Sequence, residues 1–164
     1  RRQSSNRIRC QSKRFCAGKP SNTSVKEQNM AGASKYLTTA VFNQYFVGKP
    51  TFVALFTDNP TDENDTSKEI TASWYGRKQA TFSAVQTDAG KELVKNEAQV
   101  LFSRVTGTPV RVKYWGVYDA ETGGNLLISE KVPSDDESDP DAGQSIAVGT
   151  AFLADVAALK VTFD

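Results

Sequence analysis

The stretch YWGVYDAETGGNLLI, residues Tyr114–Ile128, predicts a β-hairpin. Aromatic and branched side chains on both sides of its centre are typical of strands, where they pack against cross-strand neighbours. Between them, Gly123, Gly124 and Asn125 readily adopt the positive backbone angles that tight turns require. Trp115 is expected to pack in the core. The hairpin holds no obvious reactive group, so it indicates a local fold and not a chemistry.

Further short strands are expected on both sides of this hairpin. The run TFVALFT, Thr51–Thr57, is apolar on both faces and predicts a central strand that is covered on both sides. The segment 92–105 fits both helical and strand spacing, and we favour a strand from about Ala98. The other expected strands lie at 74–85, 110–118, 126–132, 145–153 and 159–163, and the expected turns and polar loops lie at 58–69, 86–90 and 133–144.

One short helix is expected before these strands. Ser34–Phe46 carries Leu37, Val41 and Tyr45 four residues apart, and Ser34 is a suitable N-cap. Gly48 and Pro50, just beyond, end the helix. About seven strands with one short N-terminal helix predict an all-β protein, either an antiparallel β-sandwich or a small barrel. We assign residues 30–164 to this single β-rich domain.

Residues 1–29 differ from the rest of the chain in charge. They hold eight of the 20 Lys and Arg residues and one of the 19 acidic residues. With few large apolar side chains, this basic segment is expected to be disordered. Met30 is the only methionine, and the preceding KEQN fits a purine-rich ribosome-binding site, so we expect a native start at Met30. A basic arm can bind nucleic acid, but the sequence favours the start-site interpretation.

Composition excludes many chemistries. The 164 residues include no histidine, which excludes Ser-His-Asp and Cys-His catalysis and histidine-ligated metals. The two cysteines, Cys10 and Cys16, are too few for a Cys-rich zinc site, and no phosphate-binding glycine loop is present. No apolar run approaches the ~20 residues that span a bilayer. We therefore expect no enzyme activity, no catalytic residue, no cofactor and no membrane insertion.

The acidic loops raise the question of a calcium site. Residues 58–69 and 133–144 are rich in Asp and Glu, and calcium takes six to eight oxygen ligands. Neither loop has the Gly and closing Glu of an EF-hand. Their carboxylates also lie in polar surroundings that would not raise a pKa for glycosidase chemistry. We favour solvated loops without a metal.

Two sets of side chains are candidate contact sites. The helical stripe of Leu37, Val41 and Tyr45, with Phe42 beside it, fits either docking on a sheet or self-association. Trp74, Tyr75 and Arg77 form the second set. Exposed aromatic rings stack on sugars, so these three residues are candidates for contact with a glycan or a protein partner.

Four stretches in the same order resemble small bacteriophage virion proteins that are commonly labelled tail fibre proteins. They are MAGASKYLTTAVFNQYFVGKPTFVALFTDNPTD (30–62), WYGRKQATFSAV (74–85), YWGVYDAETGGNLLI (114–128) and LKVTFD (159–164). The resemblance covers the chain from Met30 onward. Two features depart from the family pattern. The glycine that usually precedes the aromatic residue of the second strand is replaced, since Ser73 precedes Trp74 here, and the two acidic loops look longer and more acidic.

The resemblance implies a non-enzymatic structural protein of a tailed-phage virion, of tail-fibre type. Such a protein acts by self-association, expected here as a trimer, and by presenting its surface. Its expected partners are other virion proteins and a host-surface glycan, and its expected location is the virion. Two alternatives stay open: a capsid decoration protein that stabilises the head, and a carbohydrate-binding module. Nucleic acid is not an expected partner.

Overall fold

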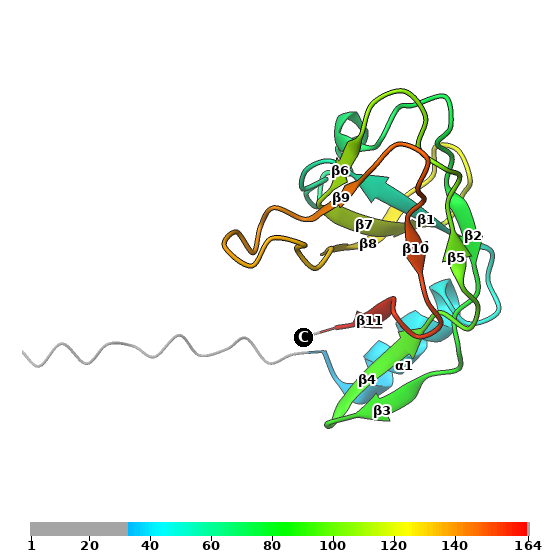
Figure 1. The fold of residues 1–164 in the computed structure, drawn as a ribbon. Coiled ribbons are helices and arrows are strands. Elements are labelled where there is room, and N and C mark those ends of the chain that lie inside the picture. The colour runs from blue at the N-terminus through cyan, green and yellow to red at the C-terminus, as the bar shows by residue number, and fades with distance from the viewer. Residues whose placement is uncertain (1–32, 164) are drawn as a thin grey trace, which may run out of the picture. The chain divides into compact units, whose positions relative to one another are not determined.

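The structure is a computed structural model that describes residues 33–163. This part of the chain contains one α-helix, one 3₁₀ helix and eleven short β-strands (Figure 1). The helices are α1 (Lys35–Tyr45) and η1 (Thr66–Lys68). The strands are β1 (Thr51–Phe56), β2 (Lys78–Ala80), β3 (Gln86–Asp88), β4 (Lys91–Lys95), β5 (Val100–Leu101), β6 (Val110–Val112), β7 (Tyr114–Tyr118), β8 (Leu126–Lys131), β9 (Gln144–Ile146), β10 (Leu153–Ala154) and β11 (Lys160–Thr162). The predicted mostly-β architecture with one short N-terminal helix is confirmed.

The largest sheet has four antiparallel strands in the order β2-β1-β7-β8. β1 is an interior strand, with Val53 opposite Lys78 on one side and Val117 on the other. Five of its six residues are buried, which confirms the prediction of a covered central strand for TFVALFT. Apolar side chains on both faces suit this position, because the sheet is packed on both sides.

The predicted hairpin is confirmed. β7 and β8 pair antiparallel, with a register shift between Val117 and Tyr118. The connecting loop is closed by the Asp119 carboxylate, which accepts a hydrogen bond from the Asn125 backbone N–H at 2.7 Å. Gly124 has φ +74°, and a Cβ there would lie 2.4 Å from Asp119 Oδ1. Glycine is therefore needed at this position both for its backbone angle and for space.

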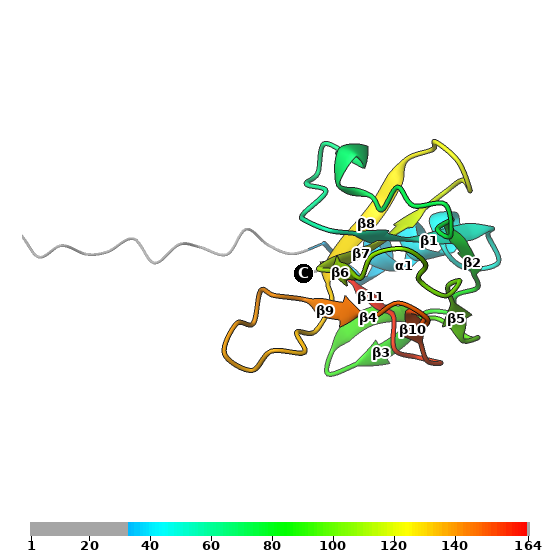
Figure 2. The same ribbon diagram turned by 45° about the horizontal axis from the view of Figure 1, so that its top comes forward.

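Three smaller antiparallel sheets complete the fold, in the orders β11-β4-β3, β10-β5 and β6-β9. α1 packs against β4, as the two views show (Figures 1 and 2). The pairing of β6 with β9 joins Val110 to Ile146 and lies beside the four-stranded sheet in Figure 2. Elements from distant parts of the sequence thus enclose one main core.

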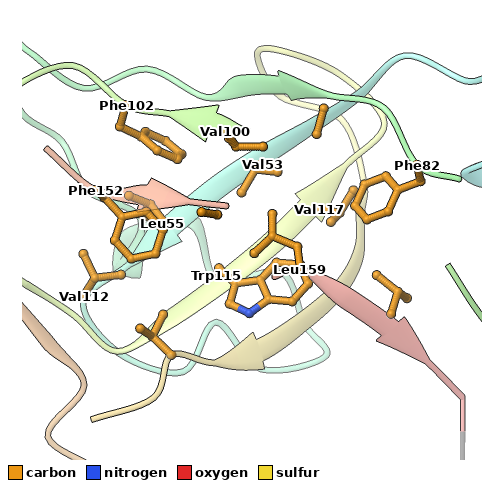
Figure 3. Packing of buried hydrophobic residues seen from close by; sticks show 14 of the residues in the cluster. Val53, Leu55, Phe82, Val100, Phe102, Val112, Trp115, Val117, Phe152 and Leu159 are labelled. Carbon is orange, nitrogen blue, oxygen red and sulfur yellow. The ribbon is translucent and has the colours of Figure 1, made fainter. Parts of the chain in front are cut away.

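The main core lies on one face of the four-stranded sheet. Figure 3 shows Leu55 and Trp115 from this sheet meeting Phe102, Phe152 and Leu159 from the strands and turns opposite. Trp115 is buried, as predicted. A second, smaller cluster on the other face contains Ala54, Phe56 and Tyr118 and packs against Leu126. The short strands thus enclose two apolar clusters, one on each face of the four-stranded sheet.

Several predicted strand boundaries were wrong. Gln86–Asp88, predicted as part of a turn, is β3, and the chain turns at Ala89 and Gly90. The run 110–118 is two strands that separate at Lys113 and join different sheets. Within 74–85, only Lys78–Ala80 is a strand. The start of the segment lies in a turn, because the Tyr75 N–H donates a hydrogen bond to the Ala72 carbonyl.

The other shifted boundaries have separate physical reasons. Asn96 ends β4, which begins at Lys91, because its buried side chain bonds the backbone of the loops around it. The expected strand from Ala98 is reduced to β5. The run 145–153 is divided between β9 and β10 by a local turn, in which Thr150 N–H donates to the Ala147 carbonyl and Gly149 has φ +85°. At Asn96, by contrast, side-chain bonds to distant backbone end a strand.

The predictions for residues 1–29, including disorder and a native start at Met30, fall outside the described residues. They remain predictions, as does the assignment of 30–164 to a single domain. No helix within residues 33–163 is long and apolar enough to cross a membrane.

Candidate interaction surface

Helix α1 is fixed at its start and along one face. The Ser34 hydroxyl accepts a hydrogen bond from the Leu37 N–H at 3.3 Å, which confirms the predicted N-cap. Thr38 and Phe42 are buried along the helix. The Phe42 ring lies 4.9 Å from that of Phe163, measured between centroids, and is fully buried. Phe42 is therefore a core residue, and including it in a self-association surface was wrong.

The start of α1 is also held by an ion pair. Lys35 Nζ lies 2.9 Å from Glu92 Oε1 on β4, and the Thr87 hydroxyl donates to the same carboxylate at 2.9 Å. These hydrogen bonds lower the pKa of Glu92, with the bond from Lys35 contributing most. The pair joins α1 to the β3–β4 hairpin and sets which face of the helix is left outside.

Beyond Lys35, the outer side of α1 carries no charge and exposes two large side chains of the predicted stripe. Leu37 is 52% exposed and Tyr45 is 47% exposed, while Val41 between them is half-buried. From Tyr36 to Gly48 the sequence has no charged residue. A surface helix of a monomer usually carries charges on its solvent side. On this side of α1, large apolar side chains therefore stand in solvent without charged neighbours on the helix.

A groove of about 340 Å³ adjoins this stripe. α1 contributes Val41 and Tyr45, the hairpin contributes Leu126 and Leu127, and Phe163, just after β11, forms the third wall. The structure thus brings predicted helix residues together with the start of β8. Sequence reasoning missed the contribution of the hairpin and of Phe163, because only the folded chain places them beside α1.

The second predicted set, Trp74, Tyr75 and Arg77, does not form one exposed platform. The Tyr75 hydroxyl accepts a hydrogen bond from Leu55 N–H at 3.0 Å and donates to Glu69 Oε1 at 2.8 Å. Its ring stacks on Phe102 with 6.0 Å between centroids. Burial raises the pKa of Tyr75. Tyr75 therefore faces the interior and is a poor candidate for an exposed contact.

Arg77 is a structural residue in this fold. Its guanidinium makes two bonds to Glu69, at 2.9 Å and 2.8 Å. Nη1 donates to the carbonyls of Ala120 and Gly123 in the hairpin loop. Only 6% of the Arg77 side chain and 12% of the Glu69 side chain are exposed. The prediction of Arg77 as a surface contact is corrected, because its charge is paired and covered.

Trp74 has a different environment from its two neighbours. It is half-exposed and lines a groove of about 290 Å³ whose other lining residues include Thr57, Ser67, Thr106 and Thr108. The indole ring can pack against the apolar face of a ligand, and Thr and Ser side chains can form hydrogen bonds with its polar groups. Sequence reasoning identified Trp74 but not these hydroxyls, which come from separate parts of the chain.

The acidic loops use their carboxylates to close local turns. Asp136 accepts from Ser138 N–H at 2.9 Å, and Asp65 accepts from Ser67 N–H at 3.0 Å. In the part of the chain that the structure describes, no three His, Cys, Asp or Glu residues are grouped so that they could hold a metal ion. The loops are thus structured by their own side chains.

Comparison with known proteins gives one family. The family model described as "Podophage GP4 fiber I protein gp80" matches residues 32–153. No curated protein matches the chain. The matched range includes α1, the Arg77 and Trp74 segments, and the β7–β8 hairpin.

Proposed function

The chain belongs to the podophage GP4 fiber I protein gp80 family, and from this membership we propose that it is a tail-fibre-type component of the virion that acts by self-association. The family makes it a structural bacteriophage protein. We propose that it has no enzymatic activity. Its lack of histidine supports this, as does the pairing of the buried Glu69 carboxylate with Arg77.

The outer face of α1 is the observation that supports self-association best. Leu37 and Tyr45 are about half-exposed on a helix whose segment Tyr36–Gly48 carries no charge. Burying such a face stabilises the assembly by about 25 cal/mol for each Å² of apolar surface that is removed from water. Copies arranged about a symmetry axis can each cover the face of a neighbour. Three copies remain the expected number, and other virion proteins the expected partners.

Light scattering coupled to size-exclusion chromatography tests this proposal in solution. Tyr45→Glu places a charge in the proposed contact and should lower the molar mass toward that of one chain. Asn43→Glu is the matched control, because Asn43 is exposed on the same helix but on the side away from Leu37, Val41 and Tyr45. Equal effects of both variants, or no assembly in the unaltered protein, would contradict the α1 contact.

Antibody labelling of virions in negative-stain microscopy tests the location. Label on the tail supports the tail-fibre assignment. Label over the head surface would replace it with capsid decoration. Particles that carry no label on either part would refute a virion protein.

A specific observation favours a second candidate function, the binding of a host-surface glycan. Trp74 and the hydroxyl groups of Thr106 and Thr108 line one groove, and sugars combine apolar ring faces with hydroxyls. A glycan array with the intact protein tests it. Binding that Trp74→Ala abolishes and Trp74→Phe retains would support this site, whereas an array without signal would argue against it.

A further inference from the structure

Strand β8 forms an open edge of the four-stranded sheet. The sheet order places β2 and β8 at its two edges. β2 has three residues and includes Lys78, but β8 has six and contains neither Pro nor Gly. Proteins usually protect an edge with short strands, proline or inward charges. β8 has little of this protection, since its only charges, Glu130 and Lys131, lie at its end.

The pairing with β7 fixes which backbone groups of β8 point outward. Val132 N–H donates to the Lys113 carbonyl at 2.8 Å, on the β7 side. Because direction alternates along an antiparallel strand, Ile128 and Glu130 also face β7, and Ser129 and Lys131 face away. Within residues 33–163, β8 has β7 as its one strand neighbour, so the outward Ser129 N–H and carbonyl have no strand partner. An added strand could bond to these outward groups.

We propose that β8 of a second copy of this chain pairs antiparallel with β8 across a two-fold axis centred on Ser129, joining two four-stranded sheets edge to edge. The contact uses the edge of β8, whose start adjoins Val41 and Tyr45 of α1, and it would link one assembly to another. It rests on the proposed self-association only in that both require a second copy.

Charge supports a second β8 as the occupant of this edge. Pairing centred on Ser129 sets Ile128 opposite Glu130 of the second copy. It also sets Leu127, the extra residue at the register shift, opposite Lys131, so that no like charges meet. A two-fold axis perpendicular to the sheet keeps each side chain on the same face in both copies. Lys131 pairs with Tyr114, on the face where Leu126 packs.

That face also carries the loop with Asp62. Asp62 and Thr61 line a small groove together with Leu126 to Ser129. The Asp62 carboxylate is exposed and forms no ion pair among residues 33–163. Opposite Leu127, Lys131 of the second copy arrives beside this groove. Lys131 already pairs with Asp141 in its own chain, so the proposed contact adds Asp62 as a second carboxylate near the same exposed ammonium group. The two-fold axis repeats this arrangement once in each copy.

Cross-linking tests the register. In a Tyr45→Glu, Cys10→Ser, Cys16→Ser background, Ser129→Cys should form a disulfide-linked dimer under mild oxidation. Gln79→Cys on the other sheet edge is the matched control and should stay largely monomeric. Failure of Ser129→Cys to exceed this control overturns the pairing. In Ser129→Cys chains that keep Cys10 and Cys16, a disulfide from the introduced thiol to either native cysteine would assign the edge to the N-terminal segment and also overturn it.

A proline variant tests the backbone bonds directly. Ser129→Pro removes an outward N–H and leaves the β7–β8 hydrogen bonds in place, because proline is tolerated at this position of an edge strand. Measured by analytical ultracentrifugation in the Tyr45→Glu background, its dimer should be about 10- to 100-fold weaker, and Ser129→Ala should be unchanged. An unaffected Ser129→Pro dimer would disprove the contact.

Charge reversal provides a test that does not depend on backbone changes. Asp62→Lys should weaken the dimer, and adding Lys131→Glu should restore it. A weakening that persists in the double variant would show that Asp62 and Lys131 do not pair, and no effect of Asp62→Lys alone would place Asp62 outside the interface; either result contradicts the proposed register. Every variant is compared with Tyr45→Glu alone, because Tyr45 lines a groove with Leu126 and Leu127 of β8 and its replacement is therefore close to this interface. With that reference, a result on β8 does not depend on the α1 contact, and each proposal can fail without the other.

Discussion

The guanidinium carbon of Arg77 lies 3.4 Å from the centroid of the Tyr118 ring. Arg77 follows the turn at Trp74, and Tyr118 ends the first strand of the hairpin. The same guanidinium bonds Glu69 and the hairpin carbonyls of Ala120 and Gly123. One side chain therefore holds the hairpin loop, the central sheet and the segment after η1 in a single arrangement.

Arg77→Ala should strongly destabilise the protein. Removing one partner of a buried ion pair leaves the other charge uncompensated, which costs about 3 to 5 kcal/mol. Urea unfolding measures the loss. Lys131→Met is the control, because Lys131 and Asp141 form an exposed pair that solvent screens and whose loss should change the stability little. An Arg77→Ala loss as small as this control would show that the network is not structural.

Asn96→Ala should destabilise the turn that precedes β11. The Asn96 amide donates to the carbonyls of Ala98 and Asp155 and accepts from Leu159 N–H, all at 2.8 to 2.9 Å. Alanine leaves these buried groups unpaired, at about 1 to 3 kcal/mol in unfolding free energy. Thermal unfolding followed by circular dichroism measures it. Asn43→Ala, at an exposed site, should have almost no effect; matching losses would refute the role of Asn96.

Gly116→Ala should destabilise the hairpin through a lack of space. A Cβ at Gly116 would lie 2.8 Å from Leu126 Cδ1 and 3.0 Å from both Ile128 O and Phe56 Cε2. Overpacking of this kind costs about 1 to 3 kcal/mol. Gly76→Ala is the matched control, since no atom lies within 4 Å of its added Cβ. Denaturant unfolding should separate the two variants, and equal stability would contradict the close packing.

Acid should destabilise the protein partly through Asp119. Its pKa is lowered from 3.8, chiefly by the hydrogen bond from the Asn125 side chain. A native pKa below the unfolded one gives stability that is present above the unfolded pKa and is lost as pH falls through the native value. Asp119→Asn should therefore lose less stability than the unaltered protein between about pH 5 and about pH 2. Urea unfolding at a series of pH values measures this, and parallel losses in the two proteins would contradict it.

The local sequence determined the elements whose signals lie within a few residues. Ser34 before an apolar stripe specified the start of α1, the apolar TFVALF specified a covered strand, and Gly123-Gly124 specified the hairpin loop. Each depends on backbone angles, capping or local periodicity, which neighbouring residues control.

Only the tertiary structure decided how these elements were used. Phe42 and Tyr45 lie on the same predicted helix, but packing against Phe163 buried one and left the other half-exposed. The sequence indicates a surface cation at Arg77, whereas the fold surrounds it with Glu69 and Tyr118. The division of 110–118 at Lys113 likewise follows from the pairing of its halves with different strands. Burial and pairing depend on residues far away in the sequence, so no local pattern could specify them.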